Sequence, residues 1–348
     1  MEKILSVVIP VFNVEDYIRK CLDSLLVPDD VLPLLDIVVV NDGTEDRSAE
    51  IAKTYESRYP DVFRVFDKEN GGRGSACNLG IAKAKGKYIS ILDSDDWYDT
   101  AQLALLVSYL REGDTDLVFM NWTRYYAAKR KEEAVRIQKL KPDVVYSSDS
   151  FDWMNSGNGF HLGYQVCTVY RTEMMQCYLP VFCEGVMYDD IILQVLPIMA
   201  SRTFIYKDLN VYHYYIGRPG QSMDPQVKAK RSEDVTTVLK QVLDFLKNNK
   251  ESIPEGTTRR IWADFHYSAF ATYHYDELSR YSFSVSKKRL ADWDRYVRAT
   301  LPDIELTGLV KLYRSTPFAV YYAFYKVYWL MLKCLRRMRS IARKLLNS

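Results

Sequence analysis

The chain has 348 residues, enough for one large domain or for a catalytic domain with a smaller appendage. Apolar residues make up 48% and charged residues 26%, as in an ordinary folded protein. The net charge of +2 excludes a chain that binds nucleic acid through overall charge, and we expect no nucleic-acid partner. The six cysteines form no CxxC pair or zinc-spaced cluster, which fits a reducing compartment.

Two further features bear on location. The N-terminus has no basic segment followed by a long apolar core, so we expect no signal peptide. No clean run of about 18 apolar residues indicates a spanning helix. The nearest, Phe318–Leu335, is interrupted by Lys326 and Lys333. We therefore expect a cytoplasmic protein.

Strand-like and helix-like segments alternate over the first 120 residues. Runs typical of buried strands are Ile4–Ile9, Ile37–Val40, Val62–Phe66, Tyr88–Leu92 and Asp116–Asn121. Segments with helical spacing lie between them at Glu15–Leu26, Ser48–Tyr59, Gly74–Lys85 and Gln102–Arg111. This alternation predicts an α/β fold with a mostly parallel central sheet flanked by helices.

The pattern weakens after residue 125. We expect the charge run Lys129–Glu133 in a solvated loop or hairpin, and Ala229–Asn248 has the spacing of an amphipathic helix. The chain from about residue 256 is rich in Tyr, Trp and basic residues and is expected to be helical. These features divide the chain into a catalytic domain, 1–225, and a helical C-terminal region, 226–348.

Polar and glycine-rich segments follow the first four predicted strands. In open α/β sheets, ligands bind beyond the carboxyl ends of the strands, so these segments are expected to line a site. They are Pro10–Asn13, Asn41–Gly43, Asn70–Arg73 and Asp93–Asp96.

The acidic segment after the fourth strand contains Asp93, Asp95 and Asp96. Three carboxylates in four residues repel one another unless a cation holds them, and alternate residues of an extended segment point the same way, so Asp93 and Asp95 can converge. Oxygen ligands favour Mg²⁺ or Mn²⁺, commonly shared with substrate phosphates. An acidic helix cap is the alternative, which one Asp suits better than three.

The loop Asn70–Ala76 precedes a predicted helix. Backbone amides at a helix start can face a diphosphate, glycine allows close approach, and Arg73 can add charge. The same residues are also common in turns, and their spacing is not that of a P-loop or a dinucleotide-binding motif.

Four ordered strings together resemble the nucleotide-binding half of family 2 glycosyltransferases, which have the GT-A fold. The resemblance is strong over residues 4–100 and continues weakly to 225. The strings are Val7–Asn13, Val39–Asp46, Asn70–Gly80 and Leu92–Trp97.

The resemblance implies roles for matching positions. Pro10 and Phe12 would line the base pocket, with Phe12 stacking near the nucleobase. Asp42 would accept a hydrogen bond from the base, which favours uracil because its N3–H is a donor. Asp93 would lie by the ribose, and Asp95 would be the main ligand of an ion that neutralises the leaving diphosphate. Further positions matched to the nucleotide sugar are Asn13, Asn70, Gly72, Arg73, Asn78 and Ser94.

A second set of motifs lies downstream. In the pair Asp189-Asp190, the resemblance makes Asp190 the catalytic base, which would take the proton of an acceptor hydroxyl as that oxygen attacks the anomeric carbon. Attack opposite the leaving group would invert the anomeric configuration. The alternative is that the pair caps a helix over Ile191–Met199, which can hold for Asp189 while Asp190 is the base.

The Tyr-rich string 212–222 completes the resemblance. It would place Arg218 and Ser222 by the diphosphate, and His213 would be a metal ligand, a diphosphate contact or a structural residue.

Several positions differ from the family pattern, and one position has two expected roles. Cys77 stands where many relatives have Arg, so a contact is missing or is supplied by Arg73, and Asp189 replaces the usual Glu. Asp96 is expected to cap the next helix or to face the acceptor. The Gln-x-x-Arg-Trp string of processive members is absent, which predicts transfer of one sugar per encounter.

The C-terminal tail, 311–348, contains no Asp or Glu and interleaves basic with aromatic residues. This composition predicts an interfacial helix on the inner face of the cell membrane, with a helix packed on the catalytic domain as the alternative.

These features predict an inverting, metal-dependent glycosyltransferase. It would use a nucleotide sugar, with UDP favoured, and a glycan or lipid-linked acceptor for cell-surface polysaccharide or glycoconjugate synthesis. The alternatives are a nucleotidyltransferase and a non-catalytic carbohydrate- or membrane-binding protein.

Overall fold

A computed structural model provides the structure of the chain, and its contacts divide the chain into two compact units, Met1–Ile261 and Trp262–Ser348. The catalytic boundary predicted at residue 225 stays a prediction. The structure describes residues 2–151, 164–218, 220–221, 227, 231–249, 271–300 and 308–327.

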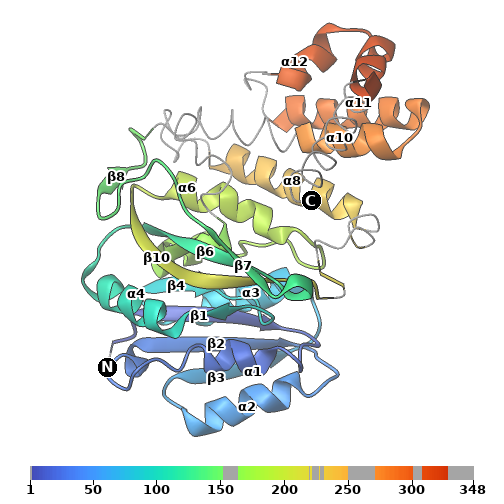
Figure 1. The fold of residues 1–348 in the computed structure, drawn as a ribbon. Coiled ribbons are helices and arrows are strands. Elements are labelled where there is room, and N and C mark those ends of the chain that lie inside the picture. The colour runs from blue at the N-terminus through green and yellow to red at the C-terminus, as the bar shows by residue number, and fades with distance from the viewer. Residues whose placement is uncertain are drawn as a thin grey trace, which may run out of the picture. The chain divides into compact units, whose positions relative to one another are not determined.

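Ten strands of the described part of the first unit form one sheet (Figure 1). Their order is β3-β2-β1-β4-β9-β6-β10-β5, with β7 added beside β6 and β8 beside β10. The strands are β1 Leu5–Val11, β2 Leu35–Asp42, β3 Phe63–Lys68, β4 Tyr88–Ile91, β5 Trp97–Tyr98, β6 Leu117–Tyr126, β7 Lys131–Val135, β8 Val145–Ser147, β9 Thr168–Arg171 and β10 Thr203–Ile216.

The N-terminal half of the sheet is parallel, as the alternating pattern predicts. β1 pairs in parallel with β2 and β4, and β2 with β3; β6 and β10 are parallel to each other, while β9 runs antiparallel between β4 and β6. The strands β1 and β2 are buried along their full length, which explains their continuous apolar sequences. The predicted α/β fold with a mostly parallel sheet is confirmed.

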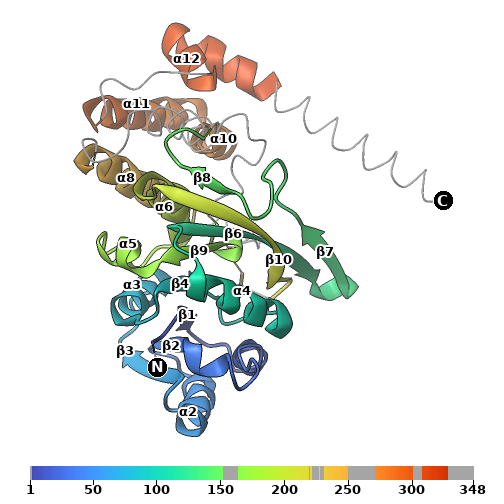
Figure 2. The same cartoon turned by 90° about the vertical axis from the view of Figure 1, so that its left-hand side faces the viewer.

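Helices cover both faces of this sheet. Figure 2 shows α3 and α5 on one side of the strands and α1 and α4 on the other. The helices of the first unit are α1 Ile18–Asp23, α2 Ser48–Arg58, α3 Arg73–Lys83, α4 Thr100–Glu112, α5 Thr172–Gln176, α6 Leu196–Ala200 and α8 Ser232–Asn248.

The order in which successive strands are added to the sheet changes direction between β1 and β4. The strands β2 and β3 lie on one side of β1, whereas β4 lies on the other, and α3 therefore crosses to the opposite face from α1 and α2. A crevice forms at the carboxyl ends of strands at such a switch point. The four predicted loop segments follow the strands that meet there.

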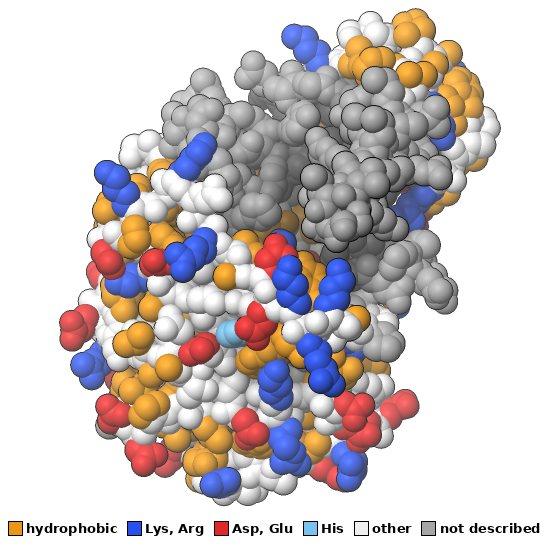
Figure 3. Space-filling model, viewed as in Figure 1, with side chains coloured by type: hydrophobic (Ala, Val, Ile, Leu, Met, Phe, Trp, Pro, Cys, Tyr) orange, Lys and Arg blue, Asp and Glu red, His pale blue; other side chains and the backbone are white. Residues whose placement is uncertain are grey.

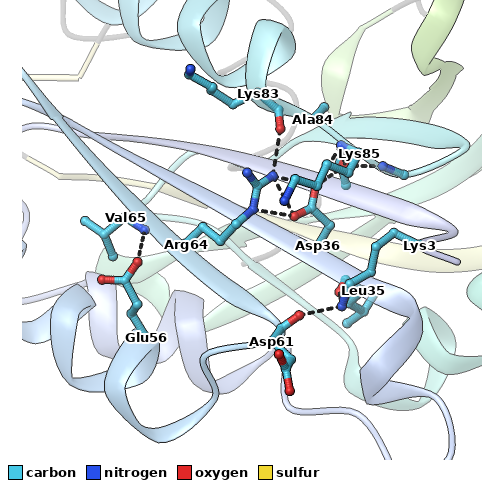
Figure 4. A network of polar contacts seen from close by, with 12 residues as sticks. Lys3, Leu35, Asp36, Glu56, Asp61, Arg64, Val65, Lys83, Ala84 and Lys85 are labelled. Atoms are coloured by element: carbon cyan, nitrogen blue, oxygen red, sulfur yellow. Dashed lines mark hydrogen bonds and ion pairs between the residues drawn. The ribbon is translucent and has the colours of Figure 1, made fainter. Parts of the chain in front are cut away.

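A buried ion pair fixes the opposite edge, where the same strands begin (Figure 4). Nε and Nη2 of Arg64 donate to the two carboxylate oxygens of Asp36, at 2.9 and 3.0 Å. Asp36 also accepts from the Ser6 hydroxyl at 2.6 Å and from the Lys85 amide at 2.9 Å. These bonds join β1, β2, β3 and the segment before β4, so they hold the strands in register far from the loops at the carboxyl ends.

Two predicted helices differ from the structure. The segment Glu15–Leu26 is helical only over α1, and residues 15–17 form turns before it. The amides of Val14 and Glu15 donate to the side chains of Ser48, which begins α2, and of Asp46. The segment Ile191–Met199 is split into the 3-10 helix Asp189–Gln194 and α6, since Pro197 at the start of α6 has no amide hydrogen to continue a helix.

The charge run Lys129–Glu133 lies in a hairpin, one of its two predicted forms: β7 pairs antiparallel with β6. The described face in Figure 3 carries Lys, Arg, Asp and Glu side chains interspersed. No helix in the described part of the chain is long and apolar enough to cross a membrane.

The described part of the second unit is helical, as predicted for this region. In it, α10 packs against α11, where Arg289 pairs with the buried Glu277, and Arg314 of α12 pairs with Asp294 at 2.6 Å. The tail residues 328–348 lie outside the described residues. The helices are α10 Ala271–Arg280, α11 Phe283–Thr300, α12 Gly308–Ser315 and a helical segment at 318–327.

Candidate active site

The loop after β1 presents an exposed aromatic ring. Phe12 is 46% exposed, an unusual position for a large apolar side chain that follows a buried strand. Asn13, with a φ of 50°, accepts at its side-chain oxygen from the Thr44 hydroxyl and the Glu45 amide, both at 2.9 Å, and so ties this loop to the one after β2. Pro10, predicted to line the same pocket, is buried inside β1.

Asp42, the last residue of β2, holds the loop that precedes α3. Its Oδ1 accepts from Lys68 Nζ at 2.8 Å and from the Gly71 amide at 2.9 Å, and its Oδ2 accepts from the Gly72 amide at 2.8 Å. Gly72 has a φ of 84°, which glycine adopts without steric cost. The Asp42 side chain is only 3% exposed, so its carboxylate lies beneath this loop. Asn70 is exposed at the entrance to this loop.

The acidic loop after β4 does not act as a single cluster of ligands. Asp93 accepts at Oδ1 from Arg73 Nε, 2.8 Å away, and at Oδ2 from Gln165 Nε2, 2.6 Å away. Asp95 instead accepts at Oδ2 from Arg218 Nε at 2.8 Å and from Gln221 Nε2 at 3.1 Å. The two carboxylates predicted to converge are therefore held by different sets of partners.

Asp96 is buried and anchors β10 to the acidic loop. Its Oδ2 accepts from the Tyr212 hydroxyl at 2.5 Å and its Oδ1 from the Tyr215 amide at 2.7 Å. Burial, reinforced by the charges of Asp95 and Asp93, raises the pKa of its carboxyl. The prediction that Asp96 caps the next helix is wrong, because Asp99 is the cap of α4, accepting from the Gln102 amide at 2.9 Å. Asp96 is also too buried to face an acceptor. Its neighbour Ser94 is buried as well.

Arg73 begins α3 and directs its guanidinium at protein groups. Its Nε donates to Asp93, its Nη1 donates to both oxygens of Asp189 at 3.1 and 3.0 Å, and its Nη2 donates to Gln165 Oε1. Each of its three nitrogens therefore has a partner within the chain, and the bonds leave one N–H of Nη2 unused. The expected contact of Arg73 with a diphosphate stays a prediction.

The predicted base lies in the first turn of the 3-10 helix. Asp189 is buried against Arg73, and burial raises the pKa of its carboxyl. Asp190 has a pKa of about 6, raised first by burial and then by the charge of Asp189. The N-cap residue of this helix is Tyr188, whose side chain makes no cap bond, and the two aspartates lie in the first turn. A carboxylate with a pKa near 6 is suited to accept a proton near neutral pH.

Asn78 positions the chain that leads to this pair. It donates from Nδ2 to the Phe182 carbonyl at 3.0 Å and accepts at Oδ1 from the Phe182 amide at 2.9 Å. Because both groups of its amide are occupied by the backbone and the side chain is buried, Asn78 lies in a structural position.

His213 is not brought to Asp95. Its ring stacks on Trp97, with centroids 5.3 Å apart, on the face of β10 opposite to Tyr212. Its Nδ1 is buried without a hydrogen-bond partner. The described residues contain no group of three His, Cys, Asp or Glu side chains placed to hold a metal ion. The prediction that His213 joins Asp95 as a ligand gains no support.

Asp95 can serve as the one protein ligand of Mg²⁺ or Mn²⁺ when waters and substrate phosphates supply the other ligands. Both hydrogen bonds to its carboxylate from described residues fall on Oδ2, which leaves Oδ1 for a ligand. Mg²⁺ usually keeps several waters and binds through one or two carboxylates together with substrate phosphates. Arg218 lies beside Asp95, as expected for a residue near a diphosphate, and Ser222 lies outside the described residues.

Two glutamines join the site without a role expected from the sequence. Gln165 contacts Asp93 and belongs to no recognised motif, whereas Gln221, which contacts Asp95, lies in the Tyr-rich string 212–222 but has no expected role there. Tyr214 lies on the same face of β10 as Tyr212. Burial, with the charges of the acidic loop and Asp190, raises the pKa of its phenol, which places Tyr214 between these two regions.

Comparisons with known proteins agree with this fold. The family model described as Glycosyl transferase family 2 matches residues 6–179. The uncharacterized glycosyltransferase EpsJ of Bacillus subtilis is 41% identical over 118 residues, which are 34% of this chain and 33% of that protein. This chain spans at most 61% of the length of the first curated relatives that it matches.

Solved structures share the fold. Residues 1–349 of S. aureus TarS in complex with UDP superpose with a TM-score of 0.70 at 18% identity, covering 95% of this chain and 92% of that chain. A mannosyltransferase of Pyrobaculum calidifontis in complex with GDP-Man and Mn²⁺ gives a TM-score of 0.50 at 16% identity, covering 94% and 87%. The architecture is thus the GT-A fold.

An α/β sheet with acidic and glycine-rich loops at its switch point defines a class of protein that binds ligands beyond the carboxyl ends of its strands. Within that class, the match of the family model over residues 6–179 shows that this chain belongs to glycosyl transferase family 2.

Proposed function

We propose that this chain is an inverting, metal-dependent glycosyltransferase that moves a sugar from a nucleotide-sugar donor, preferably a UDP-sugar, to a hydroxyl of a glycan or lipid-linked acceptor. One observation carries the proposal. A metal-competent carboxylate, Asp95, and a carboxylate with a pKa of about 6, Asp190, lie at the same carboxyl edge of the sheet. The first suits departure of a diphosphate, and the second suits attack by a hydroxyl.

The donor would lie across the switch point of the sheet. The exposed ring of Phe12 offers a face on which a nucleobase stacks. The family resemblance assigns Asp42 to the N3–H of uracil, and this residue lies at the end of β2 beneath the loop before α3. The S. aureus TarS structures contain UDP and UDP-GlcNAc, which supports a uridine nucleotide on this fold. Asp93, with two acceptor sites left beside its protein partners, would take a ribose hydroxyl.

Asp95 would hold a divalent cation together with diphosphate oxygens. The bound ion would supply Lewis-acid stabilisation of the charge that develops on the leaving diphosphate. Arg218, next to Asp95, would contact the same diphosphate. The distant mannosyltransferase structure is a complex with Mn²⁺, which supports this choice of cofactor.

Asp190 would remove the proton of the acceptor hydroxyl while that oxygen attacks the anomeric carbon. Attack on the face opposite to the diphosphate inverts the configuration at this carbon. Burial keeps Asp190 a stronger base than an exposed carboxylate, yet its pKa of about 6 leaves most of it ionised at pH 7.

Turnover of a panel of UDP-, GDP- and dTDP-sugars with Mn²⁺ tests the proposal. We expect release of a nucleoside diphosphate, loss of turnover with a chelator, and loss in Asp95→Asn and Asp190→Asn, whereas both variants keep the melting temperature. Release of inorganic diphosphate from a nucleoside triphosphate would instead identify a nucleotidyltransferase. Normal turnover of Asp190→Asn would show that the assignment of the base is wrong.

We also propose that the second unit places the enzyme on the inner face of the membrane. In the segment 318–327, Val320, Phe324 and Val327 are 57%, 52% and 60% exposed, at a spacing that puts them on one helix face. Apolar side chains on one helix face suit an interfacial location, and the basic residues of the tail sequence 311–348 would face anionic lipid.

Flotation with vesicles that contain anionic lipid tests this location. Val320→Asp combined with Phe324→Asp is expected to abolish flotation, whereas Leu105→Asp, at an exposed leucine of α4, is expected to leave it unchanged. Equal flotation of all three proteins would contradict this location.

A further inference from the structure

Two loops of the site contact each other through their backbones. The Gly185 amide donates to the Gly71 carbonyl at 2.9 Å. A Cβ at Gly74 would lie 2.1 Å from the Cys183 carbonyl and 3.1 Å from Oδ2 of Asp189, so only glycine permits this approach. The loop before α3 and the loop before the 3-10 helix are therefore in direct contact.

The guanidinium of Arg73 joins these two loops to a third. It donates to Asp93 in the loop after β4, to Asp189 beside the base, and to Gln165, which in turn donates to Asp93. The Asp189 side chain is 4% exposed, whereas those of Arg73 and Asp93 are 27% and 25% exposed. Each nitrogen of Arg73 is directed at a different residue, so these charge-assisted bonds fix the guanidinium in position as well as supply charge.

We propose that Arg73 is a positioning residue: it fixes Asp189 against the acidic loop and so holds the neighbouring Asp190 where the acceptor hydroxyl is deprotonated. The inference rests on the proposed function for Asp190. It assigns to Arg73 a structural link between the donor and acceptor halves of the site, because its bonds to Asp93, Asp189 and Gln165 hold the guanidinium between these halves.

The charge of Arg73 also affects the pKa of Asp190. The positive charge of Arg73 lowers the pKa of Asp190 and partly offsets burial and the charge of Asp189. Loss of that charge therefore raises this pKa. The other titratable groups whose charges reach Asp190 from neighbouring elements are Asp93, Cys77, Tyr164, Tyr170 and Tyr214.

The first test replaces Arg73 in the full chain and separates binding from chemistry. In Arg73→Gln we expect the Kd of UDP with Mn²⁺, measured by calorimetry, to stay within about threefold of wild type. The kcat for UDP release from UDP-GlcNAc is expected to fall about 100-fold, as for a misplaced catalytic group. The acid limb of the rate–pH profile is expected to move up by about one pH unit.

Arg73→Lys keeps the positive charge but not the planar geometry of the guanidinium. We therefore expect the acid limb of its rate–pH profile to lie where it does in wild type, and its kcat to lie between those of wild type and Arg73→Gln. Arg171→Gln removes an equally half-buried arginine that pairs with Asp114 and Asp116, and it serves as the matched control. Loss of UDP binding with an unchanged acid limb in Arg73→Gln would overturn the inference and make Arg73 a diphosphate ligand.

Hydrogen exchange gives a readout that does not depend on turnover. Amides of residues 185–194 are expected to exchange faster in Arg73→Gln than in wild type or Arg171→Gln. Unchanged exchange would overturn the inference even in an active enzyme. If wild type releases no nucleoside diphosphate from any donor, the proposed function fails, whereas the exchange result still decides whether Arg73 positions this loop.

Discussion

Arg218 donates from Nε to Oδ2 of Asp95 at 2.8 Å, so a cation of the protein itself contacts the carboxylate that is expected to bind the metal ion. We expect Arg218→Gln to strengthen binding of Mn²⁺ in the absence of nucleotide, because a positive charge beside the ligand is removed. The gain should be about tenfold, which corresponds to about 1.4 kcal/mol. Calorimetric titration with Mn²⁺ measures it.

The same variant is expected to turn over donor more slowly, since Arg218 no longer contacts the diphosphate. Arg171→Gln, remote from Asp95, provides the control for Mn²⁺ affinity. Weaker Mn²⁺ binding in Arg218→Gln would contradict the competition between the two cations.

The rate is expected to depend on the ionisation of Asp190. Burial and the charge of Asp189 raise its pKa to about 6. The base must be unprotonated, so kcat/KM should fall as the pH is lowered through about 6 and level off above about 7. A rate–pH profile at saturating Mn²⁺ measures this limb, and a flat profile from pH 5 to 8 would argue against Asp190 as the base.

Gly74→Ala is expected to separate the two loops that meet at α3. The new Cβ would lie 2.1 Å from the Cys183 carbonyl, a backbone atom that must move. We expect a loss of about 1–3 kcal/mol in the free energy of unfolding, as for overpacked sites, together with a severe loss of turnover. Chemical denaturation and UDP release measure the two effects.

Gly113→Ala is the matched control for this substitution, because its nearest described neighbour would lie at 3.2 Å and belongs to the Tyr109 side chain. Equal activity of Gly74→Ala and Gly113→Ala would show that close contact between the loops is not required.

Asp36→Asn tests the ion pair at the amino ends of the strands. The substitution leaves Arg64, 20% exposed, without its carboxylate, and removal of one partner of a buried pair costs about 3 kcal/mol or more. Glu15→Gln breaks the exposed pair with Arg47 and should cost less than about 1 kcal/mol.

Urea denaturation compares the two variants. UDP affinity is expected to stay unchanged in Asp36→Asn under conditions where the protein is folded, because the pair lies at the opposite edge from the site. Equal stability of both variants would refute the stabilising role of the Asp36 carboxylate.

The sequence by itself determined the parallel half of the fold and the set of loops that form the site. Continuous apolar runs identify strands that are buried on both faces, and residues directly after such strands must lie at the carboxyl edge wherever the helices pack. That is why Phe12, Asp42 and Asp95 were located correctly at this edge from local pattern alone.

Only the tertiary structure decided which side chains meet. Arg73 and Asp189 are 116 positions apart, and Gln165 and Asp93 are 72 apart, so no local spacing encodes these contacts. The direction of His213 depends on the register of β10 beside β5, and the burial of Asp96 depends on the Tyr212 hydroxyl. Partners of buried polar groups are fixed by packing, because each donor must find an acceptor once water is excluded.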